Sequence, residues 1–139
     1  MSDAMIYPVL AMILLTMLVW IYMYYLRIGY SLKHKIHAQK LSTPEKCNTL
    51  LPEDVNQPSN NFKNLFEAPV IFYVMTILII ITNSTDSTFV YLGWAYVGLR
   101  SIHSLIHCVF NNVMVRFVTY FVSTVLLWVM LIKFALGFV

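Results

Sequence analysis

Charged residues are scarce in this chain. They make up 11% of its 139 residues, whereas hydrophobic residues make up 60%, and the mean hydropathy is +0.74. A soluble globular domain usually has about a quarter of its residues charged. The composition therefore predicts an integral membrane protein. The length suffices for a single domain with four spans of about 20 residues each.

Cysteine is nearly absent. Cys47 lies in a polar segment and Cys108 in an apolar one, with no CxxC or other metal-binding spacing, which argues against a disulfide framework. There is no HExxH motif, and four histidines are too few for a His-rich membrane di-iron enzyme. These patterns of cysteine and histidine predict no metal centre. No internal repeat is apparent.

Basic residues are unevenly distributed. Six of the nine lie between the first and second apolar segments: Arg27, Lys33, Lys35, Lys40, Lys46 and Lys63. This clustering is typical of a cytoplasmic loop in a multi-pass membrane protein, and it does not indicate a nucleic-acid partner. With four spans, both termini are expected on the opposite side of the membrane.

Apolar runs predict four membrane-spanning helices. We place them at about residues 7–30, 60–82, 89–110 and 113–136. The first run is longer than the apolar region of a signal peptide, and no Lys or Arg precedes it, so we expect a retained span. The predicted fold class is therefore all-α, an integral membrane four-helix bundle.

The connections between these helices differ in length. A cytoplasmic loop is expected over about residues 31–59, because Leu41 to Ser59 contains three prolines among polar residues. The short link Asn83 to Ser87 makes the second and third helices antiparallel neighbours. The pair Asn111-Asn112 predicts a turn before the last helix.

Polar residues line one face of the third helix. Arg100, His103, Ser104, His107 and Asn111 follow at i, i+3, i+4, i+7 and i+11, a stripe about 100° wide. A charged side chain in the middle of a membrane helix costs at least ~2.5 kcal/mol, so it usually faces a polar cavity or a partner. We therefore expect this face to line a cavity.

The turns that precede the apolar part of the second helix, and the start of the fourth helix, supply further walls of the predicted cavity. The apolar part of the second helix, Ala68 to Ile81, covers only about 21 Å at ~1.5 Å per residue, less than a hydrocarbon core of about 30 Å. The preceding turns must therefore enter the membrane boundary. The polar residues of these turns and of the start of the fourth helix are Asn60, Lys63, Asn64, Glu67, Arg116 and Tyr120.

The residue types in this cavity suit a small zwitterionic or anionic ligand that arrives from the cytoplasm. Arginine binds carboxylates in a bidentate manner, and Glu67 can accept from an ammonium group. If the ligand carries a thiol, a guanidinium nearby favours the reactive thiolate, a role open to Arg116 or Tyr120. The apolar helix faces would then bind a hydrophobic electrophile from the lipid side.

Three motifs together resemble the MAPEG family, the membrane-associated proteins in eicosanoid and glutathione metabolism. They are Asn64-x-x-Glu67, Arg100-x-x-His103-x-x-x-His107 and Arg116-x-x-x-Tyr120, in this order on the second to fourth helices. The resemblance implies a homotrimer in which glutathione, as co-substrate, binds between neighbouring subunits near the cytoplasmic side.

The resemblance also implies roles for individual residues. Asn64 and Glu67 would hold the glutathione backbone, supported by Arg100 and His103. The catalytic residues would be Arg116 and Tyr120, near the thiol. The full set of expected glutathione-binding residues is Arg27, Lys63, Asn64, Glu67, Arg100, His103 and His107.

This chain differs from the prostaglandin E synthase branch of the family at several positions. Lys63 and Asn60 stand where that branch has arginines, and His107 where it has a tyrosine. Phe117 replaces a serine implicated in thiol activation. The segment NNFKNLFEAPVIFY is more similar to the small bacterial-type members.

The predicted function is a membrane-bound glutathione-dependent transferase or peroxidase that acts on a hydrophobic electrophile. The alternative within the same fold is a non-catalytic protein that binds a membrane lipid and presents it to a partner. A small channel or transporter is a third class. It is less favoured because the chain lacks the paired spans interrupted by Gly or Pro that form transporter sites.

Alternatives also remain for individual residues. Arg27 either reaches outward to lipid phosphates or contacts the ligand. Arg100 forms an ion pair with Glu67, contacts the ligand, or does both. His103 and His107, together with Glu67, are a weaker alternative as metal ligands.

Overall fold

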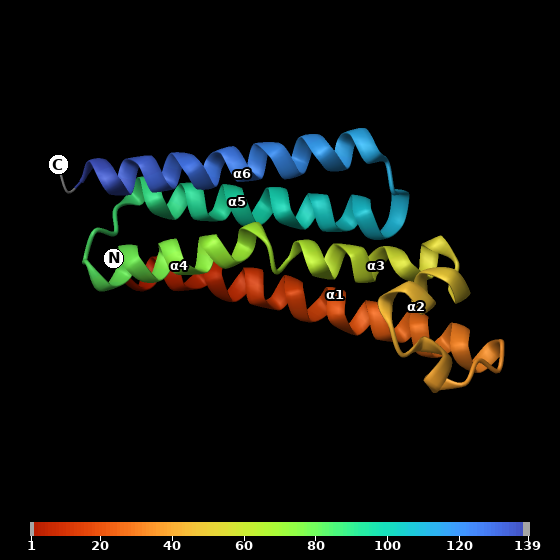
Figure 1. Ribbon diagram of the computed structural model, residues 1–139. Coiled ribbons are helices and arrows are strands. Elements are labelled where there is room, and N and C mark those ends of the chain that lie inside the picture. The colour runs from red at the N-terminus through yellow and green to blue at the C-terminus, as the bar shows by residue number, and fades with distance from the viewer. Residues whose placement is uncertain (1, 138–139) are drawn as a thin grey trace.

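Four helical rods form the computed structural model, which describes residues 2–137 (Figure 1). The rods are α1 (Ile6–Lys33), α3 (Glu53–Asn64) continued by α4 (Ala68–Ile81), α5 (Ser87–Leu105) and α6 (Val113–Leu136). Shorter elements are η1 (Ser2–Met5), η2 (Ala38–Leu41), α2 (Pro44–Leu50) and the π-helix η3 (Ile106–Phe110). Within the described residues there is no strand, so the all-α prediction is confirmed.

Three helical segments are long and apolar enough to cross a membrane: Ile6–Lys33, Glu53–Ile81 and Val113–Leu136. The helix α5 is not among them, and the polar residues of its stripe, Arg100 and His103 among them, lower its mean hydropathy. It nevertheless packs along α6 over its whole length (Figure 1). Large apolar side chains on the outer faces of α1 and α6 are exposed, as expected for surfaces that meet lipid or another membrane protein.

An apolar core fills the half of the bundle that includes α4 and the first part of α5. Phe72 on α4 stacks on Tyr96 of α5 with ring centroids 4.6 Å apart, and both side chains are fully buried. Met12 of α1 and Leu127 and Met130 of α6 pack into the same cluster. All four rods thus contribute to one core.

The segment expected to be a loop, residues 41–59, is largely helical. Pro44 lies in the first turn of α2, where a missing N–H is tolerated, and Thr43 caps that helix by accepting from Lys46 N at 3.3 Å. The next helix, α3, begins at Glu53, about seven residues before the expected start near residue 60. Two of the three prolines lie where a helix begins, Pro44 in the first turn of α2 and Pro52 at the N-cap of α3, whereas Pro58 lies inside α3.

A side-chain amide fastens α2 to α3. Asn56 Nδ2 donates to the backbone carbonyls of Cys47 and Leu51, each at 3.1 Å. Because Cys47, Leu51 and Val55 also form a small buried cluster, this segment packs against the end of α1. A propensity-based reading of the sequence does not register such a tertiary contact.

At the opposite end of the bundle, Asp86 joins α5 to α6. Its Oδ1 accepts from Phe89 N at 2.9 Å and caps α5, while its Oδ2 forms an ion pair with Lys133 near the end of α6. The Lys133 ammonium and the Phe89 amide hold the pKa of Asp86 below its usual value. Both side chains of the ion pair are partly exposed.

The lowered pKa predicts how stability depends on pH. The contribution of the Asp86 carboxylate is complete above its unfolded pKa of about 4 and is lost as the pH falls through the lower folded value. The substitution Asp86→Asn keeps a capping acceptor and removes the ion pair, so we expect a loss below about 1 kcal/mol at neutral pH that disappears in acid. Asp86→Ala should cost about 1 kcal/mol more, because the cap is lost. Thermal unfolding in detergent micelles measures both, and identical pH profiles for wild type and Asp86→Asn would contradict this role.

Candidate functional site

Arg100 lies at the centre of a polar cluster inside the bundle. Its side chain is fully buried, Nη2 donates to the backbone carbonyl of Asn64 at 2.7 Å, and the guanidinium carbon lies 5.0 Å from the centre of the Tyr120 ring. Its Nε and Nη1 have no hydrogen-bond partner in the described part of the chain. A buried cation with unused donors is well suited to binding an anionic group.

A break in the second rod makes the Asn64 carbonyl available to Arg100. The backbone leaves the helical path between α3 and α4, with Glu67 at φ −98° and ψ −103°. Pro69 follows in the first turn of α4, and its ring does not tolerate a continuous helix through the preceding turn. In an unbroken helix the Asn64 carbonyl would accept from the amide four residues later. The break therefore positions an acceptor for the buried guanidinium.

Tyr120 connects the arginine to the carboxylate of the cluster. Its hydroxyl donates to Glu67 Oε2 at 3.4 Å, while the face of its ring covers Arg100. The alternative in which Arg100 forms an ion pair with Glu67 is not seen in this structure, since the one ion pair between residues 2 and 137 joins Asp86 and Lys133. Tyr120 thus lies between the two charges.

Two histidines complete the buried part of the cluster. His103 Nδ1 lies 2.9 Å from the carbonyl of Arg116, which assigns its proton to Nδ1 and leaves Nε2 as an acceptor. The ring of His107 lies 5.7 Å from that of His103. Neither His103 Nε2 nor His107 Nδ1 has a hydrogen-bond partner among the described residues, and both side chains are buried.

The geometry does not favour the metal alternative. It requires Glu67 to join His103 and His107, but no three histidine, cysteine or carboxylate side chains within residues 2–137 come together as metal ligands. Glu67 is instead on the far side of Tyr120 and is exposed.

Arg116 is held at the turn between η3 and α6. Its Nη1 donates to Asn111 Oδ1 at 2.7 Å, and Asn111 Nδ2 donates to Glu53 Oε1 at 3.0 Å. Asn111 has φ 46°, so the turn expected at this pair is confirmed, and Asn112 caps α6 by accepting from Val115 N. The sequence analysis did not include Glu53 among the candidate site residues, because it lies in the segment expected to be a loop.

Arg27 and Lys63 lie apart from this cluster. They line a hollow of about 320 Å³ between α1, the start of α2 and α3, together with hydroxyl residues that include Ser59. Arg27 Nη2 donates to Ser59 Oγ at 3.0 Å, so its guanidinium turns toward α3 and not outward to lipid. The predicted site residues therefore divide into two groups. Seven, Arg100 included, form the cluster, and two line this hollow.

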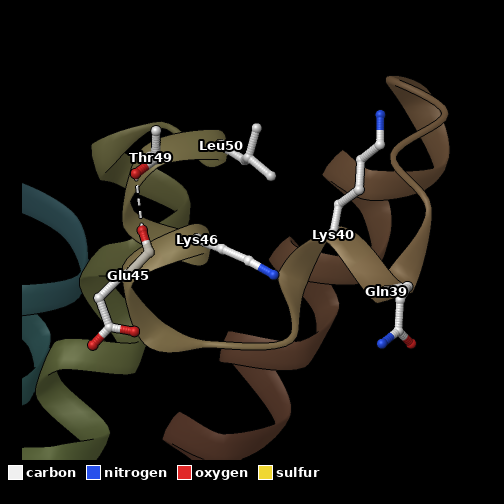
Figure 2. A pocket seen from close by; sticks show the side chains of 6 residues that line it. All are labelled: Gln39, Lys40, Glu45, Lys46, Thr49 and Leu50. Carbon is white, nitrogen blue, oxygen red and sulfur yellow. Dashed lines mark hydrogen bonds between the residues drawn. The ribbon is translucent and has the colours of Figure 1, made fainter.

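Another hollow, of about 500 Å³, lies between η2 and α2 (Figure 2). Its lining consists of Gln39, Lys40, Glu45, Lys46, Thr49 and Leu50. Figure 2 shows the Glu45 carboxylate pointing away from the Lys46 ammonium, and the hydrogen bond there joins Thr49 Oγ1 to the Glu45 carbonyl at 2.9 Å. No predicted site residue lines this hollow, so we keep the candidate site at the Arg100 cluster.

A second set of polar residues that the sequence did not reveal fastens α3 to α5 and η3. Asn61 is fully buried. It donates to Cys108 Sγ at 3.5 Å and accepts from Ser104 Oγ at 3.3 Å. The expected residue at this position was its neighbour Asn60, which is exposed. The sequence carries no signal for this contact, because Asn61 and Ser104 meet only through the packing of α3 on α5.

A buried arginine, two buried histidines and a phenol, enclosed by apolar helices, define a membrane protein with a polar site between its helices. The model of the MAPEG family matches residues 5–136, nearly the whole chain, and the chain belongs to this family. Comparison with curated proteins and with solved structures found no match. The resemblance seen in the sequence motifs is thereby confirmed.

The unused donors of Arg100 predict an unusual stability effect. Replacement of a buried, incompletely paired charge by an apolar side chain of similar volume is often neutral or stabilising. We therefore expect Arg100→Met to leave the melting temperature of the ligand-free protein unchanged or higher. For comparison, Phe72→Ala leaves a cavity in the apolar core and should lower the free energy of unfolding by about 3–5 kcal/mol. A loss in Arg100→Met as large as in Phe72→Ala would show that Arg100 is chiefly structural.

Proposed function

We propose that the chain is a membrane-bound glutathione-dependent transferase or peroxidase that acts on a hydrophobic electrophile. The MAPEG family includes glutathione transferases and peroxidases as well as non-catalytic members. The observation that carries the proposal is the Arg100 cluster, in which a buried guanidinium with unused donors lies beside a phenol that contacts a carboxylate. Such a set matches the charges of glutathione.

In this proposal each side chain has a distinct task. The free donors of Arg100 bind a glutathione carboxylate, and Glu67 accepts from its ammonium. Arg116 supports the thiolate, and Tyr120 donates a hydrogen bond to the sulfur. The thiolate then attacks the electrophilic carbon, a carbon–sulfur bond forms, and the leaving group departs with its electron pair.

Arg27 and Lys63 have a separate place in the proposal. They line the smaller hollow together with several hydroxyl residues, and Arg100 is not part of its lining. We assign them to an anionic part of glutathione that reaches beyond the Arg100 cluster. In a homotrimer this part belongs to a glutathione molecule shared with the neighbouring subunit.

The proposal includes four membrane crossings. α5 runs beside α6, its start tied to the end of α6 by Asp86 and Lys133, and its end joined to α6 by the turn at Asn111. A helix so placed must share the slab that α6 crosses. Figure 1 shows the start of α1 and the end of α6 at the end of the bundle remote from α2. The basic residues around α2 favour a cytoplasmic location for that end under the positive-inside rule, with the termini on the other side.

A homotrimer also belongs to the proposal. MAPEG members are typically trimers, and Glu67 and Lys63 are exposed in the single chain, with Arg116 and Tyr120 only half-buried. A neighbouring subunit would cover these residues and exclude water from the site. Membrane lipid would cover the remaining apolar faces.

One observation favours the alternative function, a protein that binds a lipid and presents it to a partner. Phe117, next to Arg116, is 60% exposed and stacks on Phe121 with centroids 6.1 Å apart. This pair offers an apolar surface and no hydroxyl near the proposed thiol position. A lipid chain would pack well against it.

Glutathione titration of the purified protein in detergent tests the function. We expect a rise in melting temperature at millimolar glutathione and conjugation of chlorodinitrobenzene. Arg116→Ala should lower kcat roughly 100-fold, because a preorganised charge beside the reacting atom is lost. Glu67→Gln should mainly raise KM for glutathione.

Lys40→Ala, in the hollow of Figure 2, is the matched control and should change neither constant. If millimolar glutathione leaves the melting temperature unchanged, glutathione is not the ligand. Binding without turnover would favour the lipid-presenting alternative. Full activity in both Arg116→Ala and Glu67→Gln would show that the site is misplaced.

A further inference from the structure

Arg116 is held by a chain of three side chains that ends on α3. Arg116 Nη1 donates to Asn111 Oδ1 at 2.7 Å, and Asn111 Nδ2 donates to Glu53 Oε1 at 3.0 Å. Glu53 is fixed in turn by Gln57 Nε2, which donates to the same oxygen at 3.0 Å. The other end of Arg116 is fixed as well, since its backbone carbonyl bonds to His103.

The group that accepts the hydrogen bond from Arg116 is a neutral amide and not a carboxylate. A carboxylate placed directly on Arg116 would compensate the positive charge that a bound thiolate needs. The acceptor is instead the neutral amide of Asn111, and the Glu53 carboxylate lies one hydrogen bond further away. The guanidinium is thus held in place by a strong hydrogen bond, and no residue from 2 to 137 forms an ion pair with it.

The backbone explains why an asparagine performs this task. Asn111 has φ 46° and ψ 33°, in the left-handed region that asparagine tolerates better than most side chains. Its amide N–H donates to the Ile106 carbonyl at 2.7 Å and ends the π-helix η3. The same residue therefore makes the turn and directs its side chain to Arg116.

We infer that Asn111 is the positioning residue for Arg116, and that Glu53 on α3 fixes Asn111 through its second hydrogen bond. This inference rests on the proposed function of Arg116 in supporting a thiolate. It gives α3 a role in the reaction: displacement of Glu53 displaces Asn111, and Asn111 displaces the guanidinium.

Asn111→Gly tests the inference in the full-length protein in detergent micelles. Glycine accepts the left-handed backbone, so the turn is retained while both side-chain hydrogen bonds are lost. We expect kcat with glutathione and chlorodinitrobenzene to fall about 10- to 100-fold with KM for glutathione unchanged. The ultraviolet absorbance of bound thiolate should appear only at higher pH than in wild type.

The chain offers a matched control. Asn83 also has a positive φ, 53°, and lies in the turn before α5 at the other end of the bundle. Asn83→Gly makes the same substitution at another residue of positive φ and should leave kcat and the thiolate absorbance unchanged. Glu53→Ala should lower kcat in the same direction as Asn111→Gly. Glu53→Gln should retain kcat, because its amide oxygen can accept the same bond from Asn111.

The outcomes separate the inference from the function beneath it. No glutathione binding by the wild type overturns the proposed function and the inference with it. Wild-type binding combined with unchanged kcat and thiolate absorbance in Asn111→Gly overturns the inference alone. A loss of kcat in Asn111→Gly that Asn83→Gly matches, or that follows a lowered melting temperature, also overturns it, because the role is then structural. If the wild type binds glutathione without turnover, the thiolate absorbance decides in the same way.

Discussion

Burial of the Arg100 guanidinium sets requirements for three of the four rods. The group is fully buried, so it needs an acceptor from within the protein, and α3 supplies the Asn64 carbonyl at 2.7 Å. It also needs a partner on its flat face, which the Tyr120 ring of α6 provides. Both partners require α3, α5 and α6 to stay in register. The polar contacts of this region therefore fix the relative positions of α3, α5 and α6, which apolar packing alone does not determine.

Departures from regular helix geometry supply most of these contacts. At the break before Pro69 the Asn64 carbonyl accepts from Arg100 as well as from Glu67 N, and the π-helix at Ile106–Phe110 ends in the left-handed Asn111, whose side chain holds Arg116. Such departures are frequent at functional sites because they direct backbone and side-chain groups that a regular helix keeps internal. In this chain two of them flank the same cluster.

Much of the fold was predictable from the sequence, and so was the composition of the cluster. Apolar runs predicted the long helices, and the spacing of Arg100, His103, Ser104 and His107 predicted a shared face, which is buried. The helical turns within residues 44–59 were not predicted, because prolines were read as loop residues and the contacts of Asn56 are tertiary. The contacts of Glu53 and Asn61 were missed for the same reason. Local patterns indicate which residues avoid lipid, but not which partner satisfies each of them.

The weak hydropathy of α5 bears on how the chain enters the membrane. Alone, this helix carries too many polar groups to partition readily into lipid, whereas α6 partitions readily. The two are joined at one end by the ion pair of Asp86 and Lys133 and near the other by the hydrogen bond from His103 to the Arg116 carbonyl. α5 and α6 therefore suit insertion as a preformed helical hairpin, in which the apolar second helix carries the polar first one across and shields its stripe during biosynthesis.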